Sequence, residues 1–276
     1  MRRMNVRILA LLLAPLLILA SCASTSPDGT DSSTVEPVSL RVVSYNVKHG
    51  LGMDGELNLE RIALVLEALN ADVILLQEMD ENCGRSESVD QAQALGKRLG
   101  MDSRFAPFMD FGGGRYGLAM LSRFTIVSSQ VVVLPPGTRE PRSALALVVR
   151  QGAQDIRVVN AHFDWLDDDT ERFAQATALS DAIAAMTPVL PTVFGGDLND
   201  APKSRAVLAF ERSTLPAKAR FRRIGPFGYT FPSDAPSKAI DHLLVAPAER
   251  WSTTEVQVVQ EPMASDHCPI VADLVL

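Results

Sequence analysis

Carboxylate, amide and imidazole side chains recur in six short blocks of this chain. All four histidines lie in these blocks, which are Ser44–Gly50, Leu76–Asp80, Asn160–Asp164, Gly195–Asn199, Ile240–His242 and Ser265–His267. Cleavage of a phosphoester requires a cation that neutralises the non-bridging oxygens, an oriented and activated water, and a stabilised leaving oxygen. The residue types in the six blocks can supply all three requirements.

The residue types and their spacing indicate which block binds the cation and which activates the water. Glu78 and Asp266 provide hard oxygen ligands, which suit Mg²⁺ or Mn²⁺ rather than zinc. Asp197 and Asn199 are two residues apart, so both side chains project to the same side of an extended strand end. The carboxylate can then take a proton from water while the amide contacts a phosphoryl oxygen.

A histidine–carboxylate pair is the third part of this chemistry. An imidazole that a carboxylate holds stays correctly oriented and is stabilised as a cation, and His267 with Asp241 is the candidate pair. Each block alone also has an ordinary explanation, because Gly-Asp-x-Asn is more often a turn and Ser-Asp-His can be a capped loop. The prediction therefore depends on the ordered set.

Strands and helices must bring these blocks together. Apolar runs predict strands at Leu40–Tyr45, Asp72–Leu76, Leu118–Leu121, Ala144–Arg150, Ile156–Ala161, Thr192–Gly195, Ile240–Val245 and Pro269–Val275. Each block lies where such a strand begins or ends, and strand ends are where side chains converge on a ligand in open α/β folds.

Three helices are predicted between the strands, each with an apolar stripe that faces the core. The first follows the possible N-cap Asn58, and the second opens with a capping-box spacing of Ser88 and Gln91. The third has Phe173, Ala176, Leu179, Ile183 and Met186 on one face and stops before Pro188.

The N-terminus has the features of a bacterial lipoprotein signal. A basic start precedes the apolar run Ile8–Ala20, which is too short to span a bilayer comfortably, and Leu19-Ala20-Ser21-Cys22 resembles a lipobox. We expect a signal peptide over 1–21, acylation of Cys22, a polar tether over 22–37 and one domain over 38–276. The alternative is an ordinary cleaved signal with an incidental cysteine.

Net charge and cysteine content narrow the range of partners. Removal of residues 1–21 deletes three arginines and no acid, so the formal net charge of −7 becomes about −10. The absence of a basic stripe counts against long nucleic acid as the substrate. The remaining cysteines, Cys83 and Cys268, permit one disulfide but lack the spacing of a zinc site.

In their order along the chain, the blocks resemble the endonuclease/exonuclease/phosphatase superfamily. The resemblance runs from Leu40 to Leu276 and rests on Asn46, Gln77-Glu78, His162, Gly196-Asp197-x-Asn199, Asp241 and Ser265-Asp266-His267, with secondary matches at Tyr116–Arg123, Arg142 and Arg172-x-x-Gln175-Ala176. It implies an α+β fold, a four-layer α/β/β/α sandwich with two packed, mixed and mainly antiparallel β-sheets.

The resemblance also implies a role for each site residue. Glu78 binds the metal, with Asn46 and Asp266 in the same pocket. Asp197 positions or deprotonates the attacking water, Asn199 contacts the phosphoryl group, and Asp241 orients His267. His162 and His267 stabilise the transition state, and the sequence leaves open which of them acts as a base. This chain departs from the family pattern at Leu118, where many relatives have Asn, and at Ala161, where Thr is usual.

Three further groups have two explanations each. The Gly112–Arg115 segment either places Arg115 against a phosphate or is a plain loop. Glu140 and Arg142 either support a site histidine and bind phosphate or form an exposed ion pair. Lys48 and His49 either contact substrate or lie on the surface.

These observations predict a monomeric Mg²⁺- or Mn²⁺-dependent hydrolase, anchored by lipid to the outside of a bacterial membrane. It cleaves a phosphomonoester or phosphodiester, such as a lipid head group, an inositol phosphate or a nucleotide, by in-line attack of water. The alternatives are a secreted nuclease that uses the same residues and a surface-binding lipoprotein without turnover. Specificity is expected in the loops 80–88, 106–116 and 224–239.

Overall fold

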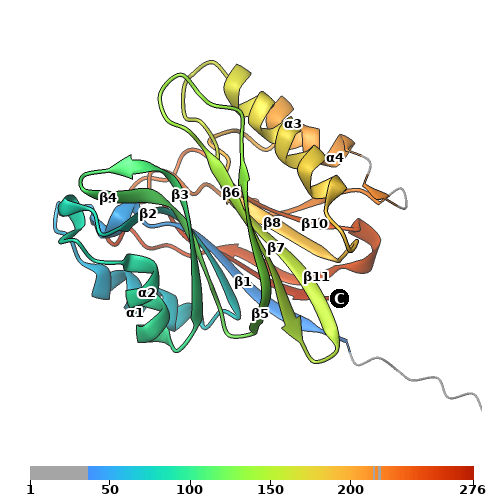
Figure 1. The fold of residues 1–276 in the computed structure, drawn as a ribbon, viewed down its shortest axis with the longest axis horizontal. Helices are drawn as coiled ribbons and strands as arrows, with labels where there is room; N and C mark the ends of the chain where they lie inside the picture. The colour runs from blue at the N-terminus through green and yellow to red at the C-terminus, as the bar shows by residue number, and fades with distance from the viewer. Residues whose placement is uncertain (1–36, 214, 217–218) are drawn as a thin grey trace, which may run out of the picture. The chain divides into compact units, whose positions relative to one another are not determined.

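Two six-stranded β-sheets stack face to face in the computed structural model, which describes residues 37–213, 215–216 and 219–276 (Figure 1). The first sheet has the order β11-β12-β1-β2-β4-β3, with strands β1 (Ser39–Asn46), β2 (Val73–Glu81), β3 (Asp102–Phe111), β4 (Gly114–Ser122), β11 (Ser252–Val258) and β12 (Ile270–Val275). The second has the order β5-β6-β7-β8-β10-β9, with β5 (Thr125–Val133), β6 (Ser143–Gln151), β7 (Gln154–His162), β8 (Thr192–Asp197), β9 (Arg222–Gly225) and β10 (Asp241–Ala246).

Helices cover the outer face of each sheet. The first sheet carries α1 (Leu59–Leu69) and α2 (Gln91–Leu99), and the second carries α3 (Thr170–Ala185) and α4 (Arg205–Arg212) (Figure 1). Short 3₁₀ turns lie at Lys48–Gly50, Gly84–Ser86 and Ala248–Arg250. The predicted four-layer sandwich is therefore confirmed. Its sheets are mixed and mainly antiparallel, because β1–β2 and β7–β8 are parallel and the other described pairs are antiparallel.

Side-chain alternation explains why the central strands are apolar on both faces. In β1, Val42 belongs to the core between the sheets, whereas its neighbour Val43 packs toward α1 and α2. Residues alternate between the faces of a strand, so a strand with a sheet on one side and helices on the other needs apolar groups at every position. The same holds for β8, where Val193 and Phe194 belong to different cores.

The structure corrects two of the helix predictions. Asn58 caps α1 as expected and accepts a hydrogen bond from the Arg61 amide. Ser88 does not cap α2; Asp90 does, since its side chain accepts from the Gln93 amide at 3.0 Å. Phe173 does not face the core: it is 37% exposed, and the Arg205 guanidinium lies 4.7 Å from its ring centroid.

Cys83 and Cys268 are free thiols, and both are buried. Within the described part of the chain, we find no helix with the length and hydropathy of a membrane span. The predicted signal, tether and acylated Cys22 lie outside the described residues apart from Pro37. Residues 37–276 form one compact unit that contains all three hydrophobic cores.

Candidate active site

The topology brings the ends of five strands to one edge of the sandwich. Asn46, His162 and Asp197 are the last residues of β1, β7 and β8, and Asp241 is the first residue of β10. The pairing of β8 with antiparallel β10 places Asp197 opposite Asp241, and parallel β7 places His162 beside Asp197. The loop before β12 supplies His267, so both sheets contribute to the site.

The carboxylate of Asp197 is the centre of this arrangement. Its Oδ2 atom lies 3.0 Å from Asn46 Nδ2 and 3.6 Å from the Nε2 atoms of His162 and His267. Its Oδ1 atom accepts a hydrogen bond from the Asn199 amide at 2.9 Å. Burial, and next to it the charge of Asp241, raises the pKa of Asp197 to about 7. A carboxyl with such a pKa can accept a proton near neutral pH.

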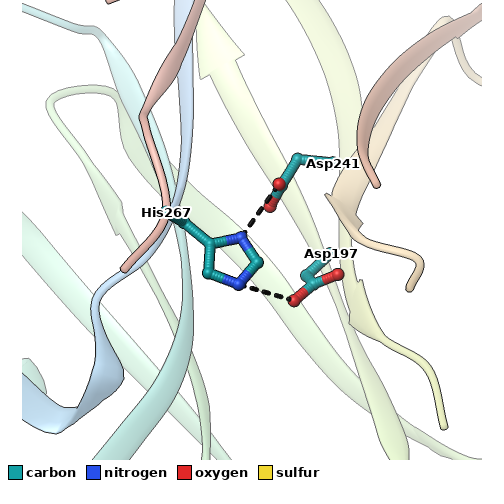
Figure 2. Close-up of side chains that lie close together, drawn as sticks. All are labelled: Asp197, Asp241 and His267. Atoms are coloured by element: carbon teal, nitrogen blue, oxygen red, sulfur yellow. Dashed lines mark hydrogen bonds and ion pairs between the residues drawn. The ribbon is translucent and has the colours of Figure 1, made fainter. Parts of the chain in front are cut away.

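His267 is held between two carboxylates (Figure 2). Its Nδ1 atom lies 2.9 Å from Asp241 Oδ2, and its Nε2 atom faces Asp197. Burial by itself lowers the pKa of His267, but Asp241 and Asp197 outweigh burial and raise the pKa to about 10. The imidazole is therefore a cation at neutral pH, with Nε2–H directed into the site.

His162 has the opposite electrostatic character. Burial, together with the charges of Arg142 and His267, moves the pKa of His162 well below its usual value. The Nδ1 atom lies 3.4 Å from Arg142 Nη1, which identifies it as the acceptor and leaves the proton on Nε2. His162 is thus a neutral donor that points at the same carboxylate oxygen as the charged His267.

Glu78 lies at an irregularity in β2. The register with β4 shifts between Gln77 and Met79, and Glu78 has a φ of 58°, in the left-handed region. Gln77 points between the sheets, where its amide nitrogen donates to Asn160 Oδ1 at 2.7 Å. The bulge redirects Glu78 to the cleft, where its Oε1 accepts from Asn46 Nδ2 at 3.0 Å.

The oxygen-rich side of the site fits a divalent cation. Burial raises the pKa of Glu78, and among the described residues Asn46 is the only hydrogen-bond partner of its carboxylate. A half-buried carboxylate so placed is stabilised by a cation. Asp266, which also lines the cleft, meets the Lys48 ammonium at 2.8 Å. Asn46 directs its amide nitrogen at Glu78 and Asp197, so in this arrangement it orients carboxylates.

A second acidic group lies beside the first. Ligand atoms of Asp197, Asp241 and His267 lie within 4.8 Å of one another and could also hold an ion. Coordination through Nε2, which faces Asp197, would require His267 to lose the proton on that nitrogen. On the Glu78 side the candidate ligands are carboxylate oxygens of Glu78 and Asp266, and Lys48 pairs with one oxygen of Asp266.

The site opens into a cleft of about 1360 Å³. Asn46 and Asp241 are buried and hydrogen-bonded to residues that line the cleft, and Cys22 lies outside the described residues. The other predicted site residues line the cleft directly, namely Glu78, Arg142, His162, Asp197, Asn199, Asp266 and His267.

The flanking groups that had two explanations are now placed. Arg142 is buried, forms a 3.0 Å ion pair with Glu140 and contacts His162, so this pair is not an exposed one. Arg115 pairs with Glu81 and does not line the cleft. His49 does not line it either.

Sequence reasoning missed Arg85, which also lines the cleft. Asp80 holds its guanidinium through two hydrogen bonds of 2.8 Å, and the rings of Phe111 and Tyr116 lie 4.4 and 5.1 Å from Arg85 Cζ. Arg85 falls within the predicted specificity loop 80–88 and follows the acidic block at the end of β2. That position is the signal that could have identified it.

Both departures from the family pattern lie away from the cleft lining. Leu118 packs in the core between the sheets, and Ala161 packs in the core under α3 and α4. The missing Thr hydroxyl therefore belongs to the helix side of β7 and not to the cleft side.

Comparison with known proteins gives the family. Residues 43–267 match the model of the Endonuclease/Exonuclease/phosphatase family. Similar folds include an endonuclease/exonuclease/phosphatase protein from Beutenbergia cavernae, with TM-score 0.67, 22% identity and coverage of 86% of this chain and 72% of that chain. The catalytic domain of human Nocturnin has TM-score 0.67, 21% identity and coverage of 87% and 96%. A mannosyl-6-phosphatase from Bacteroides thetaiotaomicron has TM-score 0.68, 18% identity and coverage of 86% and 100%.

The family match spans most of the chain, and the three structures share its fold. Members of the family are in general hydrolytic phosphoesterases, among them phosphatases, nucleases and phosphodiesterases, and they typically use a divalent metal. The chain belongs to the endonuclease/exonuclease/phosphatase family.

Proposed function

We propose that this chain is an exported, lipid-anchored hydrolase that cleaves a phosphomonoester or phosphodiester with Mg²⁺ or Mn²⁺. The observation that carries the proposal is the convergence of Asn46, His162 and His267 on Asp197 Oδ2, beside the half-buried Glu78. A carboxylate that three polar groups surround at the floor of a cleft is suited to activate water rather than to stabilise the fold.

Asp197 is the proposed base. Asn46 and the backbone amide of Asn199 fix the two oxygens of its carboxylate, so one oxygen keeps a constant direction toward the cleft. It takes a proton from water as the water attacks the phosphorus in line with the leaving oxygen. No covalent bond between enzyme and substrate is required.

The two histidines stabilise the charge that develops on the phosphoryl oxygens. His267 does so as a cation that Asp241 orients, and His162 does so as a neutral donor that Arg142 orients. Asn199 lines the cleft, and its side chain donates to the Phe163 carbonyl at 3.1 Å, which fixes the amide near the phosphoryl position. Preorganised donors of this kind account for much of the rate acceleration in such reactions.

Glu78 and Asp266 are the residues that would hold the cation. A divalent ion there supplies Lewis-acid neutralisation of a phosphoryl oxygen. Lys48 occupies one oxygen of Asp266 and must yield or share it, while the Glu78 carboxylate has one oxygen without a described partner.

The test is a substrate panel with residues 37–276, assayed with Mg²⁺, with Mn²⁺ and with EDTA. Asp197→Ala and His267→Ala should each lose hydrolysis, whereas the surface variant Asp155→Ala should keep wild-type rates. Cleavage of supercoiled DNA in preference to bis-p-nitrophenyl phosphate, phosphoinositides and nucleotides indicates the nuclease alternative. Absence of hydrolysis with every substrate and cation indicates a binding protein.

The anchor is tested separately. The full chain, expressed in a bacterium, should partition with membranes and incorporate labelled palmitate. Cys22→Ala should abolish the labelling. An unlabelled wild-type chain that is cleaved and released contradicts the lipoprotein part of the proposal and leaves the catalytic part intact.

A further inference from the structure

Connections of the second sheet line one part of the cleft with rings and cations. These aromatic and basic side chains come from strand β9 and from the β7–α3, β8–α4 and β9–β10 connections. Strands β7, β8, β10 and β9 are neighbours in the second sheet, so the connections lie close together. We call this set the aromatic–basic wall, and its members are Trp165, Lys203, Arg223, Phe227, Tyr229 and Lys238.

The cations of this wall differ from the other cations of the cleft. Arg85, Arg142 and Arg172 form ion pairs with Asp80, Glu140 and Asp200. By contrast, none of the carboxylates in the described part of the chain forms an ion pair with Lys203, Arg223 or Lys238, although Asp167 also lines the cleft. Three cations without an ion pair, gathered in the cleft of a protein with net charge −7, indicate an anionic ligand.

The side chain of Arg223 is fixed by neutral groups, and its backbone amide donates to Glu211 Oε1 at 3.3 Å. Its Nε atom donates to His242 Nδ1 at 3.1 Å, and its Nη2 atom donates to the Pro226 carbonyl. His242 is completely buried, and its Nε2 atom donates to the Asp200 carbonyl at 2.7 Å. The guanidinium is therefore held at the wall, while its charge and its Nη1 group remain available to a ligand.

The rings of the wall are unusually exposed. Trp165 is 52% exposed, Tyr229 57% and Phe227 89%, and Arg223 Cζ lies 5.7 Å from the centroid of the Phe227 ring. Flat exposed rings beside cations suit a ligand that is itself flat and charged. An acyl chain would cover the rings only by removing the cations from water without compensation.

The wall reaches the catalytic centre through Phe231. The Lys238 ammonium lies 5.9 Å from the Phe231 ring centroid, and that ring lies 4.9 Å from the ring of His267. Phe231 and Lys238 are also joined by a β-bridge, which fixes the lysine. A ligand on the wall is therefore close to a phosphoryl group held at His267.

We propose that the aromatic–basic wall binds the non-reacting part of the substrate, and that this part is a flat ring joined to a second anionic group, as in a nucleoside bisphosphate. The inference rests on the proposed function for the place of the reacting phosphoryl group. A lipid surface fits less well, because acyl chains over the exposed rings would remove the cations of the wall from water without compensation.

The test measures binding by residues 37–276 in EDTA, so that binding is read independently of turnover. The ligands are ribose 5-phosphate, thymidine 5′-monophosphate and thymidine 3′,5′-bisphosphate, titrated by calorimetry and by tryptophan fluorescence. Affinity should rise roughly tenfold when the ring is added and again when the second phosphate is added. Trp165 is exposed and Trp251 is buried, so ring binding should quench a signal that Trp165→Phe removes.

Variants separate the two contributions. Phe227→Ala should reduce the gain in affinity that the ring gives. Arg223→Gln and Lys238→Gln should each reduce the gain in affinity that the second phosphate gives. Phe173→Ala and Arg205→Gln are matched controls, because they form a ring–guanidinium pair outside the cleft lining and should change neither gain. Thermal unfolding verifies that each variant is folded.

Three outcomes overturn the inference: equal affinity for the three ligands, full retention of both gains in the wall variants, or tighter binding to phosphatidylcholine vesicles than to the bisphosphate. Failure of the proposed function looks different. In that case the ligands bind as expected, but no phosphoester is hydrolysed with Mg²⁺ or Mn²⁺.

Discussion

The Nδ1 atom of His267 lies 2.9 Å from Oδ2 of Asp241, and both side chains are buried. Asp241 does not line the cleft, so its effect on substrate passes through the imidazole. This relationship makes Asp241 a positioning residue, and it gives the first of four predictions.

Asp241→Asn should lower kcat about 100-fold and leave KM nearly unchanged, because the amide no longer stabilises the imidazolium. Steady-state kinetics on the best substrate of the panel measures kcat and KM separately. The double variant Asp241→Asn, His267→Ala should be no slower than His267→Ala alone. An independent, additive loss contradicts the positioning role.

Acid should destabilise the fold through His242. Burial is the main cause that lowers the pKa of His242 to about 4, whereas in the unfolded chain this pKa is near 6.5. The unfolded state therefore binds the proton first, and stability is lost as the pH falls from about 6.5 toward 4. At pH 4.5 the loss from this residue is about 2–3 kcal/mol.

Urea unfolding at pH 7 and pH 4.5 measures that loss. His242→Gln keeps a donor for the Asp200 carbonyl and an acceptor for Arg223 but does not titrate. The difference in unfolding free energy between the two pH values should shrink in this variant. An unchanged difference shows that other groups cause the acid sensitivity.

Glu78→Gln should weaken cation binding, because it replaces a half-buried carboxylate with a neutral amide of the same shape. Mg²⁺ or Mn²⁺ should raise the melting temperature of the wild type, since an ion that binds only the folded state stabilises it. The cation concentration at half-saturation should increase at least tenfold in Glu78→Gln. A tenfold increase corresponds to a loss of about 1.4 kcal/mol in the free energy of cation binding. Asp155→Asn, at an exposed ion pair, should respond like the wild type.

Arg85→Gln should destabilise the fold as well as raise KM. The Asp80 side chain is completely inaccessible, and Arg85 compensates its charge while remaining about one-third exposed. Removal of one partner leaves a buried charge, at a cost of about 2 kcal/mol after allowance for solvent screening. Asp80→Asn in the same chain should recover part of this loss, which a double-mutant cycle in urea measures.

The predictability of the strands follows from their place in the sheets. The eight strands predicted from apolar runs are the interior strands of the two sheets, and the four missed strands, β3, β5, β9 and β11, are the four edges. Interior strands are covered on both faces and must be apolar, whereas β5 and β11 carry exposed residues along much of their length. Edge strands thus lack the pattern on which the prediction depended.

The candidate site was more predictable than its surroundings. Residues such as Asp197 and His267 belong to motifs with a fixed order, and strand ends explain how they meet. The irregularity that turns Glu78 toward the cleft has no apolar pattern of its own. Arg85 and the aromatic–basic wall depend on which long side chains the loops bring together, and local spacing does not encode that.

The division of the chain between the sheets has a consequence for its biosynthesis. The second sheet is one continuous stretch from Thr125 to Ala246, whereas the first combines strands up to Ser122 with two that follow residue 251. His267 therefore joins its partners only after nearly all of the polypeptide has emerged. A chain that is still being made lacks one of the two histidines of the proposed site. We therefore expect a nascent chain to hydrolyse no phosphoester until its last residues have emerged.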